Sequence, residues 1–89
     1  MQTAGTQTVA VSGASAQSTA ITGEGGQYTV VRLVSTTNCH VAHGSNPTAT
    51  TNNHLIPALI PEYFKMKTGD LIAVIQNAAS GTLYITRMV

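Results

Sequence analysis

One cysteine and three histidines are the residues of this 89-residue chain that could most directly do chemistry. Cys39 and His40 are adjacent, His43 follows three residues later, and His54 lies further along. Thiolate and imidazole groups are common zinc ligands, and a cysteine near a histidine also suggests a nucleophile with its base. This group therefore raises two possibilities, a metal site and a thiol enzyme.

The spacing of these residues works against both possibilities. Residues 39–43 are predicted to form a strand, on which neighbouring side chains point to opposite faces, so His40 cannot serve Cys39 as a base. Cys39 and His43 share a face but lie about 13 Å apart at roughly 3.3 Å per residue. A metal would need His54, a bulge or symmetry-related copies. His40, His43 and His54 are thus the candidate ligands, with turn or interface roles as the alternative.

The remaining side chains do not suggest catalysis. The three acids, Glu24, Glu62 and Asp70, are predicted to be solvated or turn residues. The glycines match neither a Walker loop nor a dinucleotide fingerprint. Cys39 is expected to be a small buried hydrophobe. We predict that the chain is not an enzyme, with no catalytic residue, no cofactor and no metal.

Charge and hydropathy narrow the classes of partner. The net charge is +1 with histidine neutral, and the four basic residues form no patch, so no nucleic-acid partner is expected. No apolar run approaches the roughly 20 residues that span a bilayer, and residues 1–7 do not resemble a secretory signal. We predict synthesis in the cytoplasm, with Cys39 reduced and no membrane partner.

The scarcity of charge is the most unusual property of the composition. Asp, Glu, Lys and Arg make 8% of the chain, against about 25% in ordinary soluble domains. A free monomer normally carries an interspersed charged surface. The composition therefore predicts a homo-oligomer or a protein covered by a partner, and the alternative is a small monomer with a sticky surface.

The pattern of apolar residues indicates short strands and no helix. Residues 27–35 are predicted to form a central strand covered on both faces, and residues 61–89 a meander of three strands with turns at Thr68–Asp70 and Asn77–Gly81. Residues 1–8 are expected to be frayed, before a short strand at Val9–Val11. The predicted fold is a small antiparallel β-sandwich, jelly-roll-like or a partly open barrel.

We expect a single domain, with residues 1–22 as an N-terminal arm with edge strands and residues 23–89 as the sandwich. Alternation places Phe64 and Met66 on one face of their strand and Tyr63, Lys65 and Lys67 on the other. One face would close the core and part of the other would meet a neighbouring subunit. The predicted interface residues are Val9, Val11, Tyr63, Lys65 and Tyr84.

Several runs of the chain together carry a family resemblance. They are VVRLVSTTNCHVAHG (30–44), NPTAT (46–50), IPA (56–58), EYF (62–64), GDLIAVI (69–75) and GTLYIT (81–86). With these runs, residues 28–88 resemble small all-β structural proteins of tailed bacteriophages. His43 departs from the pattern, because a smaller or apolar residue is expected there.

The resemblance implies a virion component: a cement or decoration protein that binds the major capsid protein as an oligomer, most often a trimer. Such a protein would be assembled in the host cytoplasm, reside on the capsid surface and bridge capsid subunits. The first alternative is a head-fibre or tail-associated module that binds a host receptor or glycan, which a protruding loop at Gly44–Asn53 would favour. The second is a small metal-dependent or thiol enzyme.

Overall fold

The chain folds into strands throughout the part that the computed structural model describes, which is residues 3–21 and 27–88. These ranges hold eight strands and no helix, and hence no helix that could cross a membrane. The strands are β1 Thr3–Val11, β2 Ala16–Gln17, β3 Tyr28–Ser35, β4 Cys39–Gly44, β5 His54–Ile56, β6 Glu62–Lys67, β7 Leu71–Gln76 and β8 Gly81–Met88.

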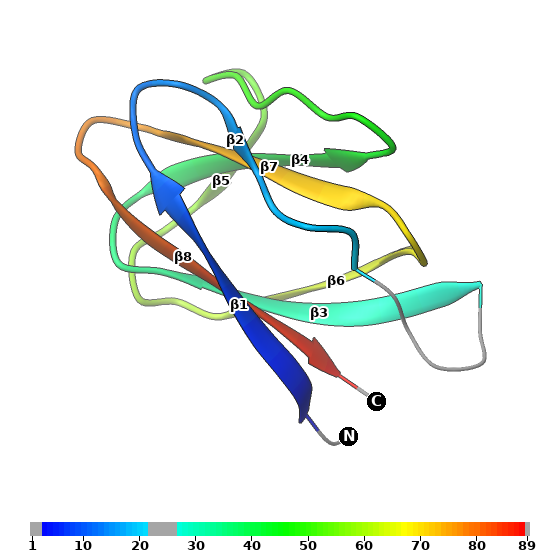
Figure 1. Ribbon diagram of the computed structural model, residues 1–89. Coiled ribbons are helices and arrows are strands. Elements are labelled where there is room, and N and C mark those ends of the chain that lie inside the picture. The colour runs from blue at the N-terminus through cyan, green and yellow to red at the C-terminus, as the bar shows by residue number, and fades with distance from the viewer. Residues whose placement is uncertain (1–2, 22–26, 89) are drawn as a thin grey trace.

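Two antiparallel sheets of four strands pack face to face (Figure 1). The order is β1-β8-β3-β6 in the first, here called sheet A, and β2-β7-β4-β5 in the second, sheet B. Successive strands from β5 onward alternate between the sheets, and β1 and β8 lie side by side, so the two ends of the chain meet (Figure 1). This is the strand order of an eight-stranded jelly roll, and the predicted β-sandwich is confirmed.

The core lies between the sheets and consists of the inward residues of every long strand. Strand β3 shows the alternation, because Val31 and Leu33 are fully buried whereas Val30 and Arg32 on the other side are half-buried. The predicted strand at 27–35 is therefore correct in position, but only one of its faces is fully covered. The core cluster is Val9, Val11, Ile21, Val31, Leu33, Cys39, Val41, Ile56, Met66, Ile72, Val74, Leu83 and Ile85.

The predicted meander at 61–89 is wrong in its pairing, although its three strands exist. β6 and β8 both belong to sheet A, where β3 separates them, and β7 belongs to sheet B. The turn at Thr68–Asp70 is tight, with the Asp70 amide donating to the Lys67 carbonyl at 3.1 Å, but it leads from one sheet to the other. Alternation within a strand fixes which side chains share a face, and it does not fix which strand becomes the neighbour.

The N-terminal segment is part of the sandwich. β1 pairs with β8 from Thr3 to Val11, and it carries Val9 and Val11 into the core. The expected fraying of residues 1–8 is thus wrong for residues 3–8, whose backbone is held by β8, while residues 1–2 lie outside the described part. Residues 3–21 supply an edge strand of each sheet, β1 in sheet A and β2 in sheet B. Glu24, predicted to be a solvated or turn residue, also falls outside the described residues.

Candidate functional site

Cys39 and His40 are the only adjacent cysteine–histidine pair, and the strand holds them on opposite faces of sheet B. Cys39 points into the core and is fully buried, while His40 is on the outer side. Burial raises the pKa of the Cys39 thiol above its ordinary value of 9.0; a hydrogen bond with Ser35 opposes this shift and the charge of Glu62 adds to it. The thiol is therefore protonated at neutral pH and has no histidine beside it, so the geometry offers no thiolate nucleophile.

His40 serves as a structural bridge. Its ring is 7% exposed, and both of its nitrogens are occupied. Nδ1 lies 3.0 Å from the carbonyl oxygen of Asn53, and Nε2 lies 2.9 Å from the side-chain amide of Asn77. Because both nitrogens are used in holding the neighbouring segments, the ring is not available as a metal ligand.

His54 also has a partner, on the opposite sheet. Its Nε2 lies 2.8 Å from Oε1 of Glu62, and its ring stands edge-on to that of Phe64, with centroids 5.3 Å apart and planes at 88°. His54 belongs to β5 of sheet B, whereas Glu62 and Phe64 belong to β6 of sheet A. This cluster links the two sheets where their edges meet.

The three histidines do not form a site together. His43 lies on the inner side of β4 near the end of the strand, where it is exposed, and His54 lies close to the same opening, but His40 is on the other face. Within residues 3–21 and 27–88, no group of three or more His, Cys, Asp or Glu side chains gathers closely enough to hold a metal ion.

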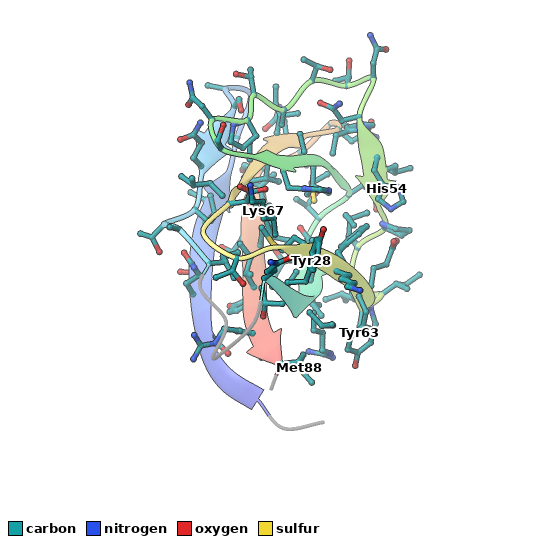
Figure 2. All side chains as sticks on the ribbon, turned by 90° about the vertical axis from the view of Figure 1, so that its right-hand side faces the viewer. Tyr28, His54, Tyr63, Lys67 and Met88 are labelled. Carbon is teal, nitrogen blue, oxygen red and sulfur yellow. The ribbon has the colours of Figure 1, made fainter. Side chains whose placement is uncertain are left out.

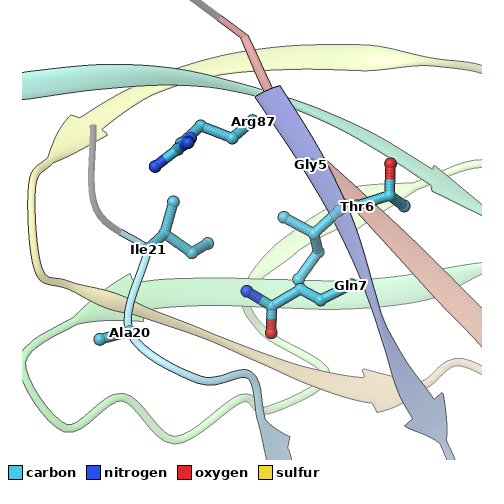
Figure 3. A pocket seen from close by; sticks show the side chains of 7 residues that line it. Gly5, Thr6, Gln7, Ala20, Ile21 and Arg87 are labelled. Atoms are coloured by element: carbon cyan, nitrogen blue, oxygen red, sulfur yellow. The ribbon is translucent and has the colours of Figure 1, made fainter. Parts of the chain in front are cut away.

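Of the cavities lined by the described residues, two open at opposite edges of the sandwich, and a third is a hollow beside Tyr28 and Lys67. One, of about 340 Å³, lies between β5 and β6, and its lining residues are Leu33, Val41, Ala42, His43, Asn53, His54, Phe64, Met66 and Ile72. The other, of about 200 Å³, lies at the opposite edge, where Ile21, Gln7 and Arg87 surround it (Figure 3). Neither cavity brings together an acid, a base and a nucleophile in an arrangement that would support catalysis.

The long connection between β4 and β5 folds back over the outer face of sheet B. Pro47 is buried and Ala49 is 2% exposed, and both lie on the side where Ala73 is also fully covered. Gln17 donates from Nε2 to the Pro47 carbonyl at 2.7 Å, and the Ala49 amide donates to Oγ of Ser15 at 2.9 Å. The loop thus forms a second small apolar layer, and sheet B has no open outer face comparable to that of sheet A.

The outer face of sheet A, by contrast, is open. It carries aromatic, aliphatic and cationic side chains. Tyr28, Tyr63 and Tyr84 are exposed to 58%, 56% and 43%. Figure 2 labels Tyr28, Tyr63, Lys67 and Met88, which strand pairing places on this face. The face is formed by Tyr28, Val30, Arg32, Val34, Tyr63, Lys65, Lys67, Tyr84, Thr86 and Met88.

Strand register sets the arrangement of charge on this face. Arg32 lies opposite Tyr63 on β6, Val30 opposite Lys65, and the Lys65 ammonium sits 5.0 Å from the centre of the Tyr28 ring. The acids lie elsewhere: Glu62 is on the inner side of β6, bound to His54, and Asp70 is in the turn after β6. Among the described residues, the charges on the outer face of sheet A are therefore all positive.

The predicted interface residues divide into two groups. Tyr63, Lys65 and Tyr84 do lie together on the outer face of sheet A. Val9 and Val11 do not, because they are 7% and 1% exposed in the domain's own core, and that part of the prediction is corrected. The predicted strand covered only residues 9–11. The observed strand has nine residues, and both valines occupy inward positions on it.

The predicted interface did not include the other members of the same face. Tyr28, Val30, Arg32 and Met88 share the outer side of β3 and β8 with the predicted residues. The alternation of β3 could have identified three of them, but its nearly continuous apolar run suggested a strand covered on both faces.

Comparison with known proteins adds no family to this description. No protein-family model, curated protein or solved structure matches the chain. The geometry itself therefore carries the functional argument, and it describes a small β-sandwich with one open, cationic and aromatic face.

Proposed function

We propose that this chain is a virion structural protein that decorates the head of a tailed bacteriophage, attaching to major capsid subunits and bridging them. The observation that carries the proposal is the outer face of sheet A. Tyrosine, methionine and arginine are enriched where proteins bind one another, and this face presents all three on a rigid sheet. The sequence resemblance to phage structural proteins supplies the kind of partner.

The side chains on the outer face of sheet A indicate what kind of partner surface would bind there. Arg32, Lys65 and Lys67 favour a partner surface with acidic side chains, and the three tyrosines favour apolar contacts between those charges. Such a contact needs no catalytic group and no cofactor. The proposed action is mechanical, because a protein bound across a subunit boundary resists the separation of the subunits.

Self-association belongs to the same proposal. A chain with only 8% charged residues has a surface poor in charge, which is suited to being covered by copies of the chain, and we propose a homo-oligomer, with the trimer as the expected form. Several copies that bind together gain avidity from individually weak contacts with a repetitive shell. The proposed location is the capsid surface, after assembly in the host cytoplasm.

A receptor-binding fibre or tail module is the weaker candidate. It would be favoured by a loop at Gly44–Asn53 that protrudes from the domain. That loop instead packs on sheet B, where Pro47 and Ala49 are buried and His40 binds the Asn53 carbonyl. This packing supports the decoration protein over the receptor-binding module, although Ser45, Asn46, Thr48 and residues 50–52 of the same segment are exposed.

Removal and restoration of the protein test the proposal. Phage particles that lack the gene should form intact heads that release DNA at a lower temperature than wild-type particles. Adding the purified protein should restore the wild-type release temperature, with the protein detected on the head by immunoelectron microscopy. Location on the tail alone, or unchanged heat resistance without the protein, would overturn the proposal.

A further inference from the structure

The turn between β5 and β6 holds two aliphatic side chains out into solvent. Leu59 is 72% exposed and Ile60 is 53% exposed, which makes Leu59 the most exposed large hydrophobic residue of the described chain. These two residues are here called the knob. A single exposed leucine is ordinary, but two adjacent ones on a well-held turn form a compact apolar projection.

The backbone of the knob is strained and fixed. Leu59 has φ of 62°, in the left-handed region that glycine enters freely and that a leucine avoids. The conformation is imposed by neighbouring hydrogen bonds: the Leu59 amide donates to the Ser35 carbonyl at 2.8 Å, and the Ala58 amide donates to Oδ1 of Asn38 at 2.8 Å. Strain of this kind persists where the surroundings over-determine it, and it is found more often at binding sites than elsewhere.

Within one molecule, the leucine side chain gains little from this position. Its large exposure shows that it contributes little to the core, and glycine would fit the backbone better. A leucine that is both strained and exposed is explained when a second molecule covers it. The relevant question is therefore which surface could receive it.

The same chain has an apolar cavity that suits the knob. The cavity of about 340 Å³ between β5 and β6 lies within the range of roughly 300–1,000 Å³ typical of ligand pockets. The cavity exists because β5 has only three residues and pairs with β4 only from Cys39 to Val41. The end of β4 at His43 therefore faces β6 with no strand between them. Its floor is aliphatic and aromatic, and its rim carries His43, Asn53 and His54.

We propose that the knob of one copy inserts into the β5–β6 cavity of a second copy. Knob and cavity are different surfaces, so the contact is head-to-tail, and it closes into a ring when the rotation between copies allows. Both partners are apolar at their centres, and the knob brings no charge that would have to be buried unpaired. This inference rests on the self-association proposed above but is independent of capsid binding.

Cross-linking between two variants, each with one added and exposed cysteine, tests the contact. A preparation of Leu59→Cys is mixed with one of His43→Cys and treated with a short bis-maleimide, and the products are separated on a denaturing gel. We expect a cross-linked dimer well above the wild-type background from Cys39, which is fully buried. The matched control mixes Tyr28→Cys with His43→Cys, because Tyr28 is also exposed but lies on the outer face of sheet A. Equal yields in the two mixtures would overturn the contact even if the protein is an oligomer.

Light scattering on Leu59 variants gives an independent readout. Leu59→Gly removes the side chain and the strain, so we expect a higher unfolding temperature in dilute solution together with at least tenfold weaker self-association. Leu59→Ala should weaken self-association equally without the rise in unfolding temperature. A wild-type protein that is monomeric at high micromolar concentration, or a Leu59→Gly variant that associates as wild type does, would overturn the proposal.

Discussion

His54 of sheet B and Glu62 of sheet A join the two sheets at their open edge, with 2.8 Å between Nε2 and Oε1. Both side chains are partly exposed, at 52% and 28%, so solvent screens the pair and its contribution to stability is small. The edge-on contact of His54 with Phe64 adds to the link. The pair therefore contributes more to the position of the β5 edge than to the stability of the fold.

A double-mutant cycle measures this link. We expect Glu62→Ala to lower the free energy of unfolding by about 0.5 kcal/mol, because the pair is partly screened. His54→Ala should have a somewhat larger effect, since it also loses the Phe64 contact. Chemical denaturation of both single variants and the double variant should give a coupling energy of about 0.5 kcal/mol. A coupling of zero at low salt would contradict the link.

The N-terminal strand should be needed for folding. Val11 is 1% exposed in the core, so Val11→Ala removes two buried methyl groups and should destabilise the protein by about 2 kcal/mol. Thr8→Ala, on the exposed side of the same strand, is the matched control and should change stability by less than about 0.5 kcal/mol. A chain that begins at residue 12 should lose its β-sheet circular dichroism; a folded truncated protein would show that β1 is dispensable.

Cys39 should make stability depend on alkaline pH. Burial raises the pKa of its thiol in the folded state, so the unfolded chain loses this proton first as pH increases. The stabilising contribution is complete below the ordinary value of 9.0 and is lost as pH rises through the higher folded value. The free energy of unfolding should thus fall more between pH 8 and pH 10 for the wild type than for Cys39→Ala, which removes the group. An equal fall in both proteins would contradict the burial of a protonated thiol.

The positions of the strands were predicted from the sequence more accurately than the pairing between strands. Alternation correctly separated Phe64 and Met66 from Tyr63 and Lys65, because side-chain direction is a local property of a strand. Pairing is a long-range property, and nothing within residues 61–89 indicated that β3 would lie between β6 and β8. The three-residue β5 was not predicted, since it is short and is followed directly by Pro57, which has no amide hydrogen to donate to a ladder.

The candidate surface was predictable in part for the same reason. Tyr63, Lys65 and Tyr84 were found from alternation, whereas Arg32 and Tyr28 join them only because β3 is the central neighbour of both β6 and β8. The covering of sheet B by its loop could not be inferred, since it depends on contacts such as Gln17 with Pro47 across thirty residues of sequence. That covering leaves sheet A as the open face of the sandwich.

The measurement that tests the central claim most directly is co-sedimentation of the purified protein with heads that lack it. The heads should be those of the phage that encodes the chain, and the variants compared should be wild type, Lys65→Glu with Lys67→Glu, and the control Thr48→Ala, which lies exposed in the loop over sheet B. We expect wild type and the control to pellet to the same saturating level. The double charge reversal should weaken binding at least tenfold while leaving the unfolding temperature unchanged, because both lysines are exposed. Equal binding of all three proteins, or no binding of the wild type, would contradict attachment through the outer face of sheet A.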